Sequence, residues 1–156
     1  MSAKFIHRSI FNTKIEKLFE FHEDKNGFDT LVGLDPNVKV IQRPENIQVG
    51  AKAILEVTLA PFVKKIWVAM HTGYEKNSFF EDSQESGPFL FFQHKHKFFS
   101  HEKGAILSDE IEFDFFALPI SKYFIVQKLK QQFKARHIAT AKYLETSFET
   151  IYSGLE

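Results

Sequence analysis

Six short β-prone segments follow one another between residues 38 and 115, and this run constrains the fold more than any other feature of the chain. Turn-forming residues, chiefly Pro, Gly and Asn, separate the segments. None of the intervening stretches is long enough to hold a helix, so neighbouring segments have to pair through short connections, which makes an antiparallel meander. The expected strands are residues 38–42, 51–60, 63–72, 78–84, 89–99 and 105–115.

The segments on either side complete a mixed architecture. Residues 3–11 predict a first strand, and a capping-box spacing from Thr13 to Glu16 then begins a helix that ends near Asp24. Residues 28–34 predict a second short helix. After Pro119 the apolar period changes to 3.6 residues, which is typical of one long helix. The expected inner stripe of that helix is Ile125, Leu129, Phe133, Arg136, Thr140, Tyr143, Leu144, Phe148 and Ile151.

This order of elements predicts one α+β domain over residues 1–156. Its seven-stranded curved antiparallel sheet has an apolar face to cover, and the long C-terminal helix is the only element large enough to cover it. A sheet that curves around one helix leaves room for a cavity between them. The composition suits a large apolar interior or cavity, because 19 of the 156 residues are Phe, against a single Trp.

Charge and composition also exclude several classes of function. The 20 basic and 20 acidic residues give no net charge, so we expect no nucleic-acid partner. No apolar run approaches ~20 residues, so we expect no integral membrane association. The absence of cysteine excludes disulfides, a thiolate nucleophile and a cysteine zinc site. A start that lacks the features of a secretory leader favours a cytoplasmic location, and the oligomeric state is left open.

Alternation along two of the expected strands predicts a histidine–aspartate cluster on the inner face of the sheet. Lys95 and Lys97 make one face of residues 89–99 the solvated one, so His94 and His96 point inward. On residues 105–115, Asp109 is the only acid on the apolar face. A carboxylate stays ionised in such a setting only with partners, and the two histidines lie nearest across the hairpin. Phe80, Asp82 and Gln84 share the same wall by the same alternation.

Several of these residues form a pattern that resembles a known family. The run Gly87-Pro88-Phe89, with Phe92, His94, His96 and Phe98 after it, is similar to a GPF-x-x-[W/F]-x-H-x-H-x-F signature. Asp82 and Gln84 precede it at the family's offset, and residues 104–113 match a second segment, with Asp109 at its acid position. Weaker likenesses lie in residues 18–22, at Trp67, and at Leu129, Phe133 and Arg136. The family is the START-related helix-grip superfamily (SRPBCC), in its ligand-binding, polyketide-cyclase-like branch.

The resemblance implies a strand, two short helices, six strands and a long C-terminal helix around a hydrophobic cavity. It also implies a small lipophilic ligand in that cavity, which is lipid-, polyketide- or aromatic-like. The chain departs from the family at three places. Ala105 replaces the usual Thr, His71 stands where an aliphatic residue is usual, and residues 118–123 lack the usual glycines. The cavity mouth and the ligand are therefore expected to differ.

Three interpretations of His94 and His96 follow. They pair with Asp109 and stabilise the interior, they recognise a polar group of a ligand, or they carry acid–base or metal chemistry. We expect neither a metal nor another cofactor, because no further ligand is spaced to assist the two histidines and Asp109. His94, His96 and Asp109 are thus the candidates for catalysis. Arg136 on the inner helix stripe has three open roles: contact with a ligand carboxylate, pairing with a nearby acid, or extension of its charged end to solvent.

The sequence therefore predicts binding of a small hydrophobic molecule between the sheet and the C-terminal helix. The alternatives are a cyclase or dehydratase that uses the His–Asp cluster, and an interaction module with a filled cavity. The candidate ligand-binding residues are Trp67, His71, Phe80, Asp82, Gln84, Phe92, His94, His96, Asp109, Phe113, Leu129, Phe133 and Arg136.

Overall fold

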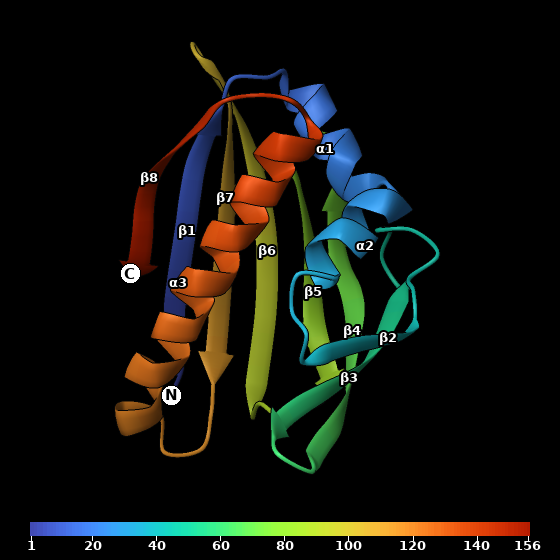
Figure 1. The fold of residues 1–156 in the computed structure, drawn as a ribbon, viewed down its shortest axis with the longest axis vertical. Coiled ribbons are helices and arrows are strands. Elements are labelled where there is room, and N and C mark those ends of the chain that lie inside the picture. Colours follow the sequence, from blue (N-terminus) through green and yellow to red (C-terminus); the bar gives the residue numbers. More distant parts are fainter.

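The predicted order of strands and helices is present as far as the long helix in the computed structural model, which describes residues 1–156 (Figure 1). The elements in chain order are β1 (Ala3–Phe11), α1 (Ile15–Glu23), α2 (Lys25–Val32), β2 (Val38–Gln42), β3 (Lys52–Ala60), β4 (Val63–Glu75), β5 (Phe79–Ser86), β6 (Phe91–His101), β7 (Gly104–Asp114), α3 (Leu118–Tyr143) and β8 (Phe148–Leu155). None of the three helices is apolar over a length that could cross a membrane.

All the strands belong to one antiparallel sheet in the order β2-β3-β4-β5-β6-β7-β1-β8. Strands β2 to β7 are neighbours in sequence order, which confirms the expected meander. The first strand then closes onto β7, so that His7 is the register partner of Asp109 and Phe5 that of Ile111. This return brings the N-terminal strand beside the strand that carries the predicted acid.

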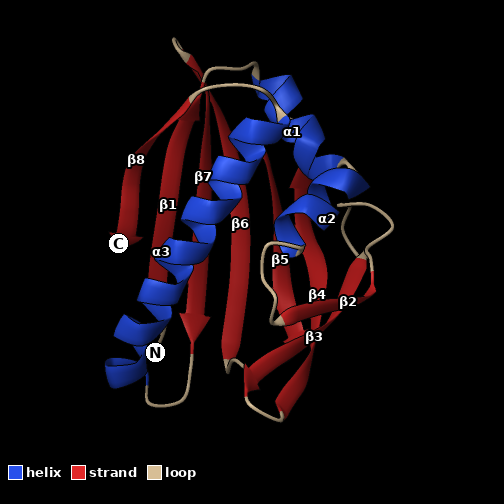
Figure 2. Ribbon diagram, viewed as in Figure 1, coloured by secondary structure: helices blue, strands red, loops and turns tan.

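The helix α3 runs across one face of the sheet (Figure 2). Its buried residues include Val126, Leu129 and Phe133. It packs against β1 and β8, while α1 packs against β6 and β7. One buried cluster joins Phe5, Ile111 and Phe113 of the sheet to Leu129 and Phe133 of the helix. The long C-terminal helix and the two short helices after β1 fit the helix-grip architecture that the sequence predicts.

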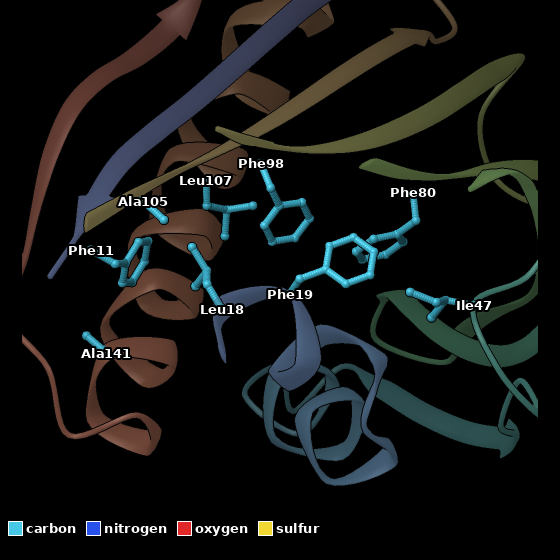
Figure 3. Close-up of a cluster of buried hydrophobic side chains, with 9 residues drawn as sticks. All are labelled: Phe11, Leu18, Phe19, Ile47, Phe80, Phe98, Ala105, Leu107 and Ala141. Carbon is cyan, nitrogen blue, oxygen red and sulfur yellow. The ribbon is translucent and has the colours of Figure 1, made fainter. Parts of the chain in front are cut away.

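A second buried cluster closes the other end of the interior. Figure 3 shows Phe19 of α1 between Phe80 and Phe98, with ring centroids 6.1 and 4.9 Å away. Large aromatic groups dominate this cluster, so much of the high Phe content serves as core. Its members are Phe11, Leu18, Phe19, Ile47, Phe80, Phe98, Ala105, Leu107 and Ala141.

The end of the chain differs from the expectation. The helix stops at Tyr143 instead of continuing through Ile151, and the following segment forms β8, so the sheet has eight strands instead of seven. Glu145 ends the helix in the left-handed region, at a φ of 51°. Phe148 then stacks on Phe11 of β1, with ring centroids 5.6 Å apart. Pairing with the open edge of β1 thus outweighs the helical spacing of these residues.

Candidate functional site

The inner wall of the sheet brings together the polar side chains that the sequence places on one face. Strand pairing aligns His71 of β4 with Asp82 of β5, and Asp82 with His94 of β6. The next inward position of β6, His96, pairs with Phe80 on one side and with Asp109 on the other. Both β6 histidines are buried, as the alternation predicts.

Asp109 lies at the centre of the predicted cluster and is buried. His94 Nε2 lies 2.8 Å from Asp109 Oδ1 in a hydrogen bond. His96 Nδ1 lies 2.8 Å from the same oxygen, out of line for a hydrogen bond. The second oxygen, Oδ2, is hydrogen-bonded at 2.7 Å to Nε2 of His137 on α3. One carboxylate therefore contacts three imidazoles, two on the sheet and one on the helix.

These contacts shift the pKa values of Asp109, His96 and His94 in different ways. Burial by itself raises the pKa of Asp109, but the charge of His96 and the hydrogen bonds from the imidazoles hold it well below its usual range. Burial lowers the pKa of His96, yet Asp109 and Asp82 outweigh that effect, so this pKa lies above 6.5. The pKa of His94 is lowered by burial and by the charge of His96. Asp109 is thus ionised, and His96 holds a proton more firmly than His94 does.

Sequence reasoning missed the groups behind Asp109. His137 Nδ1 lies 2.7 Å from Ser9 Oγ, and Ser9 Oγ lies 3.2 Å from Thr150 Oγ1 on β8. The His7 ring meets the His137 ring edge-on, with centroids 4.4 Å apart. A signal for His137 was present, since it follows Phe133 by four residues and therefore shares its helix face.

The β5 carboxylate lies beside the histidine pair. Asp82 Oδ2 is 3.8 Å from His96 Nε2, and one donor atom each from Asp82, His94 and His96 lie within 4.8 Å of one another. Burial raises the pKa of Asp82, but the neighbouring His96 and His94 outweigh burial and lower it. The expectation of no metal depends on the lack of another ligand near the two histidines, and the fold places the Asp82 carboxylate near them.

An aromatic wall continues from this polar group toward β4. The ring of Trp67 meets Phe92 edge-on at 4.9 Å and lies 5.5 Å from Phe89. Trp67, Phe89 and Phe92 are half-buried, whereas most of the core is fully enclosed. The indole Nε1 of Trp67 is shielded from solvent and has no hydrogen-bond partner. The wall thus combines apolar surface with an unused donor.

Five of the other predicted ligand-binding residues are occupied by contacts within the protein, either in the packed core or with the backbone. Phe113, Leu129 and Phe133 lie in the packed core, and Phe80 is buried with its ring stacked on His96 at 4.0 Å. Gln84 is occupied by the backbone, because its Nε2 donates to the Phe89 carbonyl at 2.8 Å and its Oε1 accepts from the Phe89 N–H at 3.2 Å.

His71 and Arg136 keep polar atoms without partners. His71 is buried, its Nδ1 has no hydrogen-bond partner, and burial lowers its pKa. Arg136 is half-buried on α3, with its guanidinium carbon 5.2 Å from the centre of the Phe133 ring. Arg136 forms no salt bridge, and burial lowers its pKa although the charges of Asp109 and Asp82 act to raise it. Both groups can accept a new partner without breaking an existing contact.

Side chains fill much of the space between the sheet and α3. The Phe133 ring rests edge-on against His94, with centroids 5.2 Å apart. Two hollows of about 390 and 410 Å³ lie elsewhere, beside the strand pair β1–β8. They are lined mainly by polar residues, such as Asn12 and Glu149 in one, Lys4 and Glu112 in the other. Neither hollow is lined by any of the predicted ligand-binding residues.

No protein-family model and no curated protein matches the sequence. Solved structures do match, beginning with Ara h 8.0201, at a TM-score of 0.66 and 14% identity over 91% of this chain and 99% of that one. The di-domain ARO/CYC StfQ from the steffimycin biosynthetic pathway gives 0.70 and 9%, over 93% of this chain and 51% of StfQ. Norcoclaurine synthase from Thalictrum flavum gives 0.67 and 11%, over 92% and 87%. These matches show that the chain has the helix-grip fold.

Proposed function

We propose that this helix-grip chain binds a small, largely apolar molecule that carries at least one hydrogen-bonding group. The observation that carries the proposal is the pair of shielded, unpartnered polar atoms Trp67 Nε1 and His71 Nδ1 on the inner wall. Buried polar atoms in folded proteins are nearly always hydrogen-bonded, so such a pair beside aromatic surface favours a ligand. Small-molecule sites combine apolar lining with a few polar groups in this way.

The names of two fold neighbours support a small organic molecule as the ligand. One is a synthase and the other an ARO/CYC protein of a biosynthetic pathway. Trp67, Phe89 and Phe92 would contact the apolar part of the molecule. Arg136, which has no carboxylate partner, would contact an acidic or carbonyl oxygen if the ligand carries one.

A second candidate function is acid–base catalysis of the cyclase or dehydratase kind. The observation that favours it is the opposite displacement of two neighbouring pKa values, with that of His96 raised and that of His94 lowered. Such divergence separates an acid from a base. In this mechanism His94 would remove a proton next to a carbonyl, and protonated His96 would donate to the oxygen on which charge develops. Asp109 would orient both rings.

The lone tryptophan gives a direct test of binding. Native mass spectrometry of the purified protein would detect a retained molecule, and the fluorescence of Trp67 would follow titration with aromatic polyketide-like compounds and with anilinonaphthalene sulfonate. We expect a saturable one-to-one change. Phe92→Ala should weaken binding at least tenfold, whereas Phe99→Ala, on the opposite face of β6, should leave it unchanged.

Two results would contradict the proposal. One is the absence of any saturable fluorescence change with these probes, which would favour an interaction module with a filled interior. The other is equal binding by the Phe92 and Phe99 variants. A compound that is converted, with conversion lost in His94→Ala while binding persists, would instead support the catalytic candidate.

A further inference from the structure

The geometry points to a metal site on the same wall: we propose that Asp82, His94 and His96 bind one divalent transition-metal ion of the zinc class. The three side chains come from adjacent strands. Asp82 and His94 are direct register partners, and His96 follows His94 by two residues on the same face. One donor atom from each lies within 4.8 Å of the other two.

The spacing is close to what a metal ion requires. Zinc–nitrogen and zinc–oxygen bonds of about 2.0–2.2 Å place neighbouring tetrahedral ligands about 3.4 Å apart. Asp82 Oδ2 and His96 Nε2 are already 3.8 Å apart. Small side-chain rotations on two paired strands would close the remaining distance, and the backbone would not have to move.

Asp109 occupies the position of a supporting carboxylate for His94, to which it is hydrogen-bonded, and lies next to His96. It engages Nε2 of His94 and lies 2.8 Å from Nδ1 of His96. The ring nitrogens left free by Asp109 are Nδ1 of His94 and Nε2 of His96, and the second of these faces Asp82. A carboxylate on the far nitrogen fixes the orientation of a metal-ligating histidine and raises its basicity. The bond from His137 to Asp109 holds that carboxylate in turn.

The donor set selects the class of ion. Two imidazoles and one carboxylate suit zinc, iron, nickel or copper, whereas magnesium and calcium prefer oxygen ligands alone. The ligands are held on ordered strands, with His96 stacked under Phe80 and His94 covered by Phe133. Three protein ligands leave a fourth position for water, as in open zinc sites.

The proposed metal site has a different third ligand from the one that the sequence suggests. From the sequence, Asp109 is the possible third ligand beside the two histidines, and no metal is expected. In the fold, Asp82 lies at the proposed ligand position, and Asp109 is hydrogen-bonded to His94 and close to His96. Burial lowers the pKa of Arg136 on α3, and the negative charges of Asp109 and Asp82 act in the opposite direction.

The test measures zinc directly, on protein stripped with a chelator and free of any organic ligand, so its outcome is independent of the proposed binding function. Calorimetric titration with Zn²⁺ at pH 7 should show one ion per chain. Asp82→Asn should weaken binding at least a hundredfold, and Asp109→Asn about 10–100-fold, the usual effect of a supporting carboxylate. Glu81→Gln removes the neighbouring carboxylate on the outer face of β5 and should leave binding unchanged.

A second measurement keeps the proposal falsifiable if a variant fails to fold. Long-range ¹⁵N–¹H NMR spectra of the unmutated protein report the state of each imidazole nitrogen. Zn²⁺ should shift the signals of His94 Nδ1 and His96 Nε2 and leave those of His101, at the far end of β6, unchanged. The proposal is wrong if no one-to-one binding occurs, if Asp82→Asn binds as well as Glu81→Gln, or if the shifted signals belong to other histidines.

Discussion

Asp109 illustrates how a single residue can organise its surroundings. It is the only acid on the apolar face of β7, and it contacts imidazoles from β6 and from α3. Burying a carboxylate without such partners destabilises the folded state. Removing the carboxylate also destabilises it, because the buried partners are then left without a hydrogen bond. The residue therefore links the helix to the sheet as well as shaping the candidate site.

Replacing Asp109 separates its charge from its size. Asp109→Asn should lower the pKa of His96, because the carboxylate that favours its protonated form is gone. Asp109→Ala should reduce the free energy of unfolding by about 1–3 kcal/mol, since buried partners are left unsatisfied. Histidine NMR titration and urea unfolding would measure the two effects.

Asp114, on the outer face of the same strand and paired only with the N-terminus, provides the matched control. Asp114→Asn should change the free energy of unfolding by no more than about 0.5 kcal/mol. If Asp109→Ala unfolds at the same urea concentration as the unmutated protein, the proposed role of Asp109 is wrong.

At the scale of elements, residues 148–155 test whether helical spacing or strand alternation describes the end of the chain, which forms the strand β8. Phe148 and Ile151 share a face in a helix, because they are three residues apart. In the structure, Phe148 stacks on Phe11, whereas Ile151 lies at the irregularity in the β1–β8 register and is 45% exposed. The two residues should therefore respond differently to truncation.

Phe148→Ala should lower the free energy of unfolding by about 2 kcal/mol, which is less than for a fully buried Phe because this ring is half-buried. Ile151→Ala should change it by no more than about 0.5 kcal/mol. Thermal or urea unfolding of both variants would measure the difference. Equal losses would indicate that the two side chains share one buried face, as the helical interpretation required.

The sequence predicts correctly those elements in which the pattern of polar and apolar residues fits only one assignment of faces. On β6 and β7 the alternation assigns one face of each strand to the interior without ambiguity, so the inward histidines and their contact with Asp109 are predictable. The end of α3 is not, because Phe148 and Ile151 fit a helical spacing and Glu145, rather than a glycine, occupies the left-handed position. His137 and the placement of Asp82 beside His96 depend on packing across elements, which no single segment encodes.

On the scale of the whole molecule, buried histidines make stability depend on pH. Burial lowers the pKa of His7 to about 4 and that of His22 to about 3. In the unfolded chain both would titrate near 6.5, so below that pH the unfolded state binds protons that the folded state does not. Their contribution is complete above pH 6.5 and is lost as the pH falls toward their folded values.

The free energy of unfolding should therefore fall between pH 6.5 and pH 4, by about 1.4 kcal/mol per pH unit for each histidine kept neutral. His96 has the opposite sign, since its raised pKa stabilises the fold below 6.5 and that gain is lost as the pH rises through its folded value. Urea unfolding across this range would show the slope, and His22→Gln should reduce it. A flat profile between pH 4 and 6.5 would contradict the expectation.

The returning strand β8 also determines how the interior can open. A lid needs one free end and a hinge, and α3 lacks a free end. Its first turn follows β7 after residues 115–117, and its last turn leads within four residues into β8, which is paired with β1. Lifting the helix would break that ladder and the bond from His137 to Asp109. Access for the proposed ligand should therefore depend on the connecting loops and the short helices α1 and α2, and its exchange should follow the nanosecond-to-microsecond motions of loops.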